Sequence, residues 1–320
     1  MATADQIKSL TKAYVERNDE KFKVVVLQIA AHEAKLGHEN LARELKQQID
    51  KITPTLASVV RLTPQNPMLI TTFPNNSLSE LIVSENISEK IKQILREYRN
   101  KSKLKSFGFA NRRKILLEGK PGTGKTLTAS IIASELSLPL YTIQMDKLVT
   151  KFMGETSAKL RQIFDTIQST LGIYLFDEFD AIGADRSLDN EVGEMRRILS
   201  SFLQFLEQDF SESIIIAATN NSKLLDQALF RRFDDILHYT LPTKQEIIRL
   251  LNYKFNECEG IDNINLDSLV DYAIGLSQAE IVKVCNDAIK RSILNDIPIT
   301  QNEIIKLFNE QHEIYQYKEA

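Results

Sequence analysis

The chain has 320 residues, of which 43% are hydrophobic and 26% are charged, and its formal net charge is −3. This length and composition suit a globular protein with one large domain and a smaller one. The small negative charge gives no reason to expect nucleic acid or an anionic membrane as the main partner. The chain starts without a signal-peptide pattern and has no apolar run that could span a bilayer, so a cytoplasmic protein without membrane contact is expected.

Three amphipathic stretches open the sequence and predict a small all-α N-terminal domain over residues 1–53. In each stretch the apolar residues recur at helical spacing, as Val25, Val26 and Ile29 do in the second. Glu33 interrupts that apolar stripe. A helical module of this size is typical of a domain that binds a substrate or a partner protein.

A proline-rich segment follows. Four of the eight prolines fall within it, at Pro54, Pro64, Pro67 and Pro74, among threonine, asparagine and serine. Proline at this density interrupts regular helix, so residues 54–77 are predicted to form an extended linker.

From residue 78 onward, short apolar runs alternate with segments of helical period. The runs predict strands at 114–118, 138–144, 173–177, 213–219 and 235–241. This alternation favours an α/β fold with a mostly parallel sheet over residues 78–241. After Pro242 only helical patterns remain, so residues 242–320 are predicted to form a helical lid and a tail.

The first chemical motif is Gly119-Lys-Pro-Gly-Thr-Gly-Lys125-Thr126, between a predicted strand and a predicted helix. It fits the P-loop pattern, in which glycines turn backbone N–H groups toward phosphates and the following helix adds partial positive charge. Lys125 is expected to reach the terminal phosphates of ATP, and the Thr126 hydroxyl to ligate Mg²⁺. The residues expected to bind the nucleotide here are Pro121, Gly122, Thr123, Gly124, Lys125, Thr126 and Leu127.

The second motif is Ile173-Tyr-Leu-Phe-Asp177-Glu178, four apolar residues that end in two acids. This pattern places both carboxylates at the C-terminal edge of a buried strand, where doubly wound sheets bind ligands. Asp177 is expected to hold Mg²⁺, and Glu178 to act as the general base that activates water. The two motifs together predict an ATP-hydrolysing site.

With these motifs the chain resembles the AAA family of ATPases from about residue 78 to residue 308. The resemblance implies a five-stranded parallel sheet of order 5-1-4-3-2 with a helical lid, and a homo-hexamer with ATP between subunits. A helical N-terminal module on a proline-rich tether also resembles the arrangement of katanin- and spastin-like ATPases. The architecture, with its short helical start, resembles as well the stand-alone bacterial AAA proteins that are encoded beside subtilisin-like proteases.

The resemblance assigns further residues. Asn220, at the end of Ser213-Ile-Ile-Ile-Ala-Ala-Thr-Asn220, resembles the sensor-1 residue that helps to position the attacking water. Arg231 and Arg232 resemble the arginine-finger segment, and either could face the phosphates of a neighbouring subunit. The lid turn resembles sensor 2, and the segment before the first helix resembles the adenine contact. The residues implied there are Gly275, Ala279, Ile82 and Val83.

Lys151-Phe152-Met153-Gly154-Glu155 resembles the aromatic, glycine-hinged pore loop of AAA translocases. Phe152, Met153 and Gly154 are therefore expected to grip an extended polypeptide, against the alternative of simple loop packing. This favours a chaperone or unfoldase that remodels proteins, with a subtilisin-like protease as a candidate partner. One departure is Leu206-Glu-Gln-Asp-Phe210, which lacks the glycine usual at the subunit signal and leaves the detail of that interface open.

Two other functions stay open. One is a nucleotide-gated adaptor, in which ATP switches a partner-binding assembly without processive translocation. The other is a DNA-acting ATPase that uses the basic residues between Arg96 and Lys114. The acidic balance of the chain disfavours the second, and those basic residues also suit a solvated helix end beside a strand.

Overall fold

The computed structural model describes residues 66–148, 155–182, 189–221, 230–256, 264–295 and 297–319, with scattered positions before residue 66. For residues 181–182, 189–197 and 315–319 it describes the backbone only. The chain divides into two compact units, Met1–Gln65 and Asn66–Ala320.

Within the first unit, the described part of the second amphipathic stretch is helical. Val25, Val26 and Ile29 are buried, as their spacing predicts. Glu33 is buried too, and its carboxylate shares a hydrogen bond of 2.7 Å with Nδ1 of His38. The buried carboxylate of Glu33, which interrupts the apolar stripe, therefore has a hydrogen-bond partner.

The second unit is built on one sheet of six strands in the order β1-β3-β4-β5-β2-β6. All neighbouring strands are parallel except β1 and β3, which are antiparallel. Numbered from the P-loop strand, β6-β2-β5-β4-β3 is the predicted order 5-1-4-3-2, so the expected α/β class is confirmed. The strands are β1 (Leu69–Thr72), β2 (Lys114–Gly119), β3 (Leu140–Ile143), β4 (Ile173–Phe176), β5 (Ile214–Thr219) and β6 (Asp235–Tyr239).

The sixth strand, β1, corrects the prediction of a linker over residues 54–77. Residues 66–77 belong to the second unit, and Leu69–Thr72 pairs with β3 along its whole length. Pro67 and Pro74 flank this strand and leave its N–H groups able to pair. Its burial alternates along the strand, which is typical of an edge strand with one covered face.

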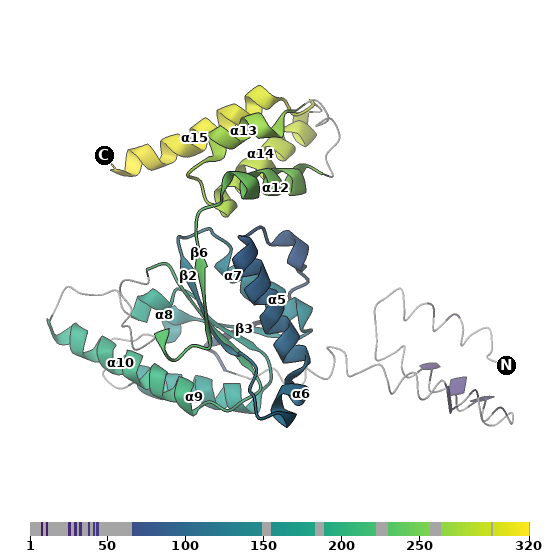
Figure 1. The fold of residues 1–320 in the computed structure, drawn as a ribbon, viewed down its shortest axis with the longest axis vertical. Helices are drawn as coiled ribbons and strands as arrows, with labels where there is room; N and C mark the ends of the chain where they lie inside the picture. Colours follow the sequence, from purple (N-terminus) through teal and green to yellow (C-terminus); the bar gives the residue numbers. More distant parts are fainter. Residues whose placement is uncertain are drawn as a thin grey trace. The chain divides into compact units, whose positions relative to one another are not determined.

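Helices cover both faces of the sheet (Figure 1). Alternate residues of β2 show this division, because Ile115 and Leu117 pack in a core with α5 and α7, whereas Leu116 packs in a core with α8, α9 and α10. All four residues of β4 are buried, as expected of a strand that is covered on both sides. These elements are η1 (Leu78–Glu80), α5 (Glu85–Arg99), α6 (Lys101–Ser106), α7 (Lys125–Glu135), α8 (Met145–Leu148), α9 (Glu155–Ser169), η2 (Phe179–Ile182) and α10 (Asp189–Gln208).

After β6 the chain forms a helical layer with a hydrophobic core of its own. Thr243 begins this layer as a helix cap: its backbone N–H donates to Glu246 at 2.7 Å, and its hydroxyl accepts from the Glu246 N–H. The layer stands beyond the end of β6 in Figure 1 and consists of α12 (Lys244–Phe255), α13 (Leu266–Ala273), α14 (Gln278–Asn295) and α15 (Gln301–Glu319). It corresponds to the predicted lid.

Candidate functional site

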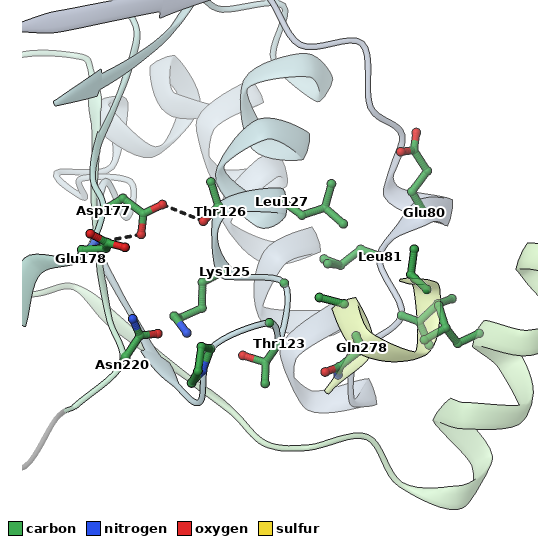
Figure 2. Close-up of a pocket in the computed structure, with 17 residues that line it drawn as sticks. Glu80, Leu81, Thr123, Lys125, Thr126, Leu127, Asp177, Glu178, Asn220 and Gln278 are labelled. Carbon is green, nitrogen blue, oxygen red and sulfur yellow. Dashed lines mark hydrogen bonds between the residues drawn. The ribbon is translucent and has the colours of Figure 1, made fainter. Parts of the chain in front are cut away.

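A cavity of about 460 Å³ lies between the P-loop and the lid helices (Figure 2). Its walls come from the ends of β4 and β5, the start of α7, the segment around η1, and helices α12 and α14. The predicted site residues that line it are Ile82, Pro121, Gly122, Thr123, Gly124, Lys125, Thr126, Leu127, Asp177, Glu178, Asn220 and Ala279. The fold thus brings together residues that are up to 197 positions apart, from Ile82 to Ala279.

Other predicted residues lie elsewhere. Val83 is buried against the sheet core, and neither it nor Gly275 is among the residues that line the cavity. Arg231 and Arg232 do not line it either. The predicted pore loop, Phe152, Met153 and Gly154, lies outside the described residues.

The P-loop turns through two glycines with left-handed backbone. Gly122 has φ +75° and Gly124 has φ +97°, values that other residues rarely adopt. A Cβ at Gly122 would also lie 2.5 Å from Oγ of Ser277 in the lid. Buried Thr123 holds the loop between the glycines, because its hydroxyl donates to the Lys120 carbonyl at 2.8 Å. The loop therefore needs its glycines both for its curvature and for the close approach of the lid.

Lys125 is 6% exposed and curls back onto the P-loop. Its Nζ donates to the carbonyls of Gly119 at 2.7 Å and Lys120 at 2.8 Å. Burial lowers the pKa of Lys125, and the nearby carboxylates of Asp177 and Asp180 oppose that shift. The two bonds use two of the three N–H donors of the ammonium group, which leaves a cation held at the floor of the cavity.

Thr126 and Asp177 meet across the cavity from different elements. The Thr126 hydroxyl donates to Oδ2 of Asp177 at 2.7 Å, from the start of α7 to the end of β4 (Figure 2). Hydroxyl and carboxylate oxygens are ligands that suit Mg²⁺, which usually keeps several waters and binds substrate phosphates. Within the ranges that the structure covers, no group of three or more His, Cys, Asp or Glu side chains is placed to hold a metal ion.

Glu178 is exposed at the cavity and has φ +50°, a conformation that is unusual for a residue other than glycine. Its backbone N–H donates to Oδ1 of Asp177 at 2.9 Å. Such a backbone costs about 1–3 kcal/mol and occurs most often where function requires it. Asp177 thus bonds to Thr126, while Glu178 lines the cavity and stays exposed.

Asp180 belongs to the site although the sequence analysis missed it. Its Oδ1 accepts from the Thr219 hydroxyl and from the Asn220 backbone N–H, both at 3.2 Å. These bonds tie the end of β5 to the segment after β4 and set the place of Asn220. The spacing Asp177-Glu-Phe-Asp180 is a sequence signal for this residue, but its partner on β5 is decided by the sheet.

The lid supplies further lining residues that no sequence motif indicated. Leu250 of α12 and Val282 of α14 line the cavity together with Leu81, and Gln278 lies at the start of α14. The lid is joined to the P-loop directly, since the Ala279 N–H donates to the Gly122 carbonyl at 2.9 Å. The lining is therefore partly apolar, at Leu81, Leu250 and Val282, and partly the polar P-loop.

The two candidate arginines lie at the surface, just before β6. Both are exposed, and Nη1 of Arg232 pairs with Oε1 of Glu207 on α10 at 2.5 Å. Neither side chain lines the cavity of its own chain.

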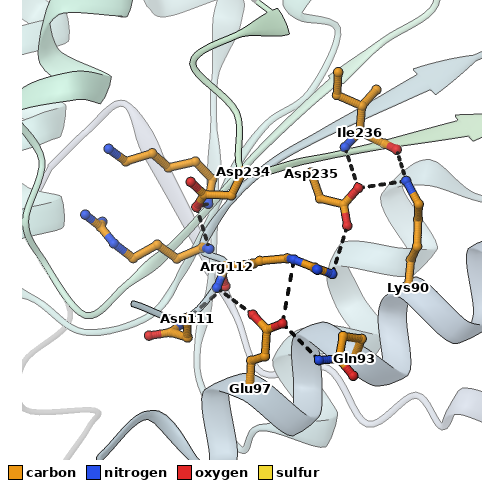
Figure 3. A network of polar contacts seen from close by, with 10 residues as sticks. Lys90, Gln93, Glu97, Asn111, Arg112, Asp234, Asp235 and Ile236 are labelled. Carbon is orange, nitrogen blue, oxygen red and sulfur yellow. Dashed lines mark hydrogen bonds and ion pairs between the residues drawn. The ribbon is translucent and has the colours of Figure 1, made fainter. Parts of the chain in front are cut away.

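A polar network fixes the chain directly after these arginines (Figure 3). Asp235 pairs with Lys90 of α5 at 2.7 Å and with Arg112 at 3.2 Å. Asp234 accepts from the backbone N–H groups of Arg113 and Lys114, each at 2.9 Å. The start of β6 is therefore anchored to both α5 and β2.

Four of the eight basic residues between Arg96 and Lys114 form ion pairs within the chain. Arg112 pairs with Asp235 and Glu97, Arg113 pairs with buried Asp209, and Arg99 and Lys101 pair with Glu135 and Glu212. These ion pairs favour a structural role for the stretch over contact with nucleic acid. Separately, none of the helices within the described ranges combines the length and the apolar character that a membrane span requires.

Comparison with known proteins places this geometry in a family. Residues 115–241, from the P-loop strand to the end of the α/β layer, match the model of the ATPase family associated with various cellular activities (AAA). An uncharacterized AAA family ATPase, y4kL, of Sinorhizobium fredii is 32% identical over 303 residues, which cover 92% of this chain and 90% of that protein. The chain belongs to the AAA family.

Other relatives of this AAA protein have names that refer to proteolysis. A proteasome-activating nucleotidase of Saccharolobus solfataricus is 29% identical over 292 residues, or 84% of this chain and 74% of that protein. The ATP-dependent zinc metalloprotease FtsH 3 of Sphaerobacter thermophilus is 29% identical over 220 residues, or 67% of this chain and 45% of that protein. The chain spans less than half of the second relative, so the likeness to it concerns the ATPase part.

Proposed function

We propose that this AAA protein binds ATP with Mg²⁺ in the cavity between P-loop and lid, hydrolyses it, and uses the cycle to remodel a protein substrate. The observation that carries the ATPase proposal is the convergence of Lys125 with the Thr126–Asp177 pair. These groups come from two distant motifs and meet at one edge of a parallel sheet, where such folds bind ligands.

The residues present fit a nucleotide with a divalent cation. The left-handed backbone of Gly122 and Gly124 lets the P-loop turn its N–H groups toward a phosphate. Thr126 and Asp177 offer oxygen ligands to Mg²⁺, and the apolar lining from Leu81, Leu250 and Val282 suits a base. Mg²⁺ would supply charge neutralisation at the phosphates during transfer.

In the proposed mechanism, each side chain has one task. Lys125, already desolvated, stabilises negative charge on the terminal phosphates. Glu178 faces the open cavity and acts as the general base toward the attacking water, and Asn220 orients that water from the end of β5. Arg231 or Arg232, at the surface of the same chain, reaches the phosphates of a neighbouring copy in a homo-hexamer.

The remodelling role rests on the relatives and on the predicted pore loop. Relatives named for proteasome activation and for ATP-dependent proteolysis act on proteins, and we propose a protein substrate here as well. Phe152, Met153 and Gly154 would grip the substrate in the central pore. The N-terminal helical unit would select the substrate or a partner such as a subtilisin-like protease.

Phosphate release tests the ATPase proposal. We expect wild type to hydrolyse ATP in Mg²⁺, Lys125→Ala to lose nucleotide binding, and Glu178→Gln to keep binding while turnover falls about 10²–10⁴-fold. Glu212→Gln is the matched control, because this exposed carboxylate pairs with Lys101 far along the sheet from Glu178. Wild-type turnover in Glu178→Gln would refute the role of Glu178.

Light scattering and substrate unfolding test the assembly and the remodelling role. Glu178→Gln should accumulate as hexamers with ATP and Mg²⁺, and Phe152→Ala should stop unfolding of a model substrate while ATP turnover continues. Phe107→Ala is the control, since this phenylalanine is 71% exposed at the end of α6. Hexamers that regulate a partner without turnover would instead identify a nucleotide-gated adaptor.

A further inference from the structure

Tyr239, the last residue of β6, contacts both the start of the P-loop and the helix that follows the loop. In the sheet it pairs with Gly119, the first glycine of the loop. A Cβ added at Gly119 would lie 2.2 Å from the Tyr239 carbonyl oxygen, so the two residues are in close contact. The Tyr239 side chain is 4% exposed, and its hydroxyl lies 2.6 Å from Oγ1 of Thr128 in the first turn of α7.

Thr128 connects this tyrosine to Gly124. The Thr128 hydroxyl donates to the Gly124 carbonyl at 3.0 Å, and the Thr128 backbone N–H donates to the same carbonyl at 2.9 Å. A hydroxyl has one proton to donate, so a Thr128 hydroxyl that donates to Gly124 accepts from Tyr239. Burial raises the pKa of Tyr239, and its hydroxyl therefore stays protonated and able to donate. The two hydroxyls and the Gly124 carbonyl form a directed series of hydrogen bonds, the hydroxyl relay.

The hydroxyl relay ends at the peptide bond between Gly124 and Lys125, where α7 begins. Gly124 is the N-cap of α7 and has left-handed backbone, with φ +97°. Because a trans peptide unit is planar, a bond that holds the Gly124 carbonyl also sets the direction of the Lys125 N–H on the opposite side of the unit. The N–H groups at the start of a helix are the donors that a P-loop offers to phosphate. The relay therefore acts on a phosphate-binding donor without lying in the cavity.

We propose that Tyr239 is a positioning residue for nucleotide binding, which acts through Thr128 to hold the Lys125 N–H toward the phosphates. This inference rests on the proposed function, because it requires phosphates in the P-loop. Neither Tyr239 nor Thr128 is among the residues that line the cavity between P-loop and lid. Thr128 is fully buried, so its hydroxyl serves the loop and not the ligand. The effect of both hydroxyls on binding is therefore indirect.

Tyr239→Phe tests the relay, since it removes only the hydroxyl and keeps the buried ring. Thr128→Val removes both side-chain bonds of the threonine, whereas Thr128→Ser keeps the hydroxyl. Tyr174→Phe is the matched control: Tyr174 is also a buried tyrosine of the sheet, but its hydroxyl donates to the Thr170 carbonyl at 2.8 Å, just before β4. Calorimetry measures ADP binding to each full-length variant without requiring turnover, and denaturant unfolding without nucleotide measures its stability.

We expect Tyr239→Phe to bind ADP about fivefold more weakly than wild type, the ratio that corresponds to about 1 kcal/mol for one neutral hydrogen bond. Thr128→Val should weaken binding at least as much, and Thr128→Ser should bind ADP as wild type does. The double variant Tyr239→Phe/Thr128→Val should bind like Thr128→Val alone, because the tyrosine acts through the threonine. Tyr174→Phe should lower the unfolding midpoint and leave the affinity for ADP unchanged.

Three results would overturn the inference. Wild-type affinity for ADP in Tyr239→Phe, with only a lower unfolding midpoint, would leave the hydroxyl a purely structural role. Additive losses in the double variant would show that the two hydroxyls act independently. An equal loss of affinity in Tyr174→Phe would assign the effect to general destabilisation. If wild type binds no ADP, the proposed function itself fails and the inference with it, whereas binding by wild type that Tyr239→Phe does not weaken removes the inference alone.

Discussion

The close approach of the lid to the P-loop can be tested by adding one methyl group. Gly122→Ala places a Cβ 2.5 Å from Oγ of Ser277 and 3.2 Å from Cβ of Ala279, at a residue with φ +75°. Gly124→Ala is the matched control. It has a similar left-handed backbone, with φ +97°, but its added Cβ meets only Cδ1 of Leu81 at 3.5 Å, an ordinary van der Waals distance.

The expected effects follow from these two geometries. A left-handed backbone costs an alanine about 1–2 kcal/mol, and both variants bear this penalty. Insertion of a methyl group into a tight contact costs about 1–3 kcal/mol more, and only Gly122→Ala bears this term. The free energy of unfolding should therefore fall by about 1–2 kcal/mol in Gly124→Ala and by about 2–5 kcal/mol in Gly122→Ala.

Denaturant unfolding without nucleotide measures the difference, at one protein concentration and with the oligomeric state checked for each variant. Addition of Ser277→Ala to Gly122→Ala should recover part of the extra loss, because it removes the atom at 2.5 Å and leaves the Ser277 Cβ position at 3.1 Å. Equal destabilisation by the two glycine variants, with no recovery from Ser277→Ala, would refute the lid contact.

The polar network and the aromatic core give two further expectations. Asp235→Asn should lower the free energy of unfolding by about 1–3 kcal/mol, because this carboxylate is 12% exposed and pairs with two cations. Asp271→Asn is the control: Asp271 and its partner Lys244 are both exposed, so the change should be less than about 0.5 kcal/mol. Equal effects in thermal melts would show that the network adds no stability. Phe202→Ala should lower the free energy of unfolding by about 3–5 kcal/mol, because Phe202 is fully buried at the centre of the aromatic cluster. Phe210 is 87% exposed, so Phe210→Ala should lower it by less than about 0.5 kcal/mol. A mild Phe202→Ala phenotype would contradict the packing of α10 on the sheet.

The class of the fold could be predicted because its strands have local signals. A strand such as Ile173–Phe176, buried on both faces, is a run of apolar residues, and the spacing between such runs leaves room for helices. The edge strand β1 had no comparable signal. Its residues Leu69–Thr72 alternate in burial and stand among prolines that suggest a linker, and only pairing with β3 makes them a strand.

The residues of the site also differ in how far the sequence alone could predict them. The sequence by itself determined the P-loop, because its glycines, Lys125 and Thr126 form one contiguous turn whose chemistry depends on local backbone. It also indicated Asp177 and Glu178, because a buried strand must end where polar side chains begin. Only the tertiary structure decided that Asp180 ties β5 to the segment after β4, that Arg231 and Arg232 lie outside the cavity of their own chain, and that Ala279 of the lid bonds to the P-loop. These contacts join elements that are distant in sequence, and the packing that creates them leaves no repeating pattern in the sequence.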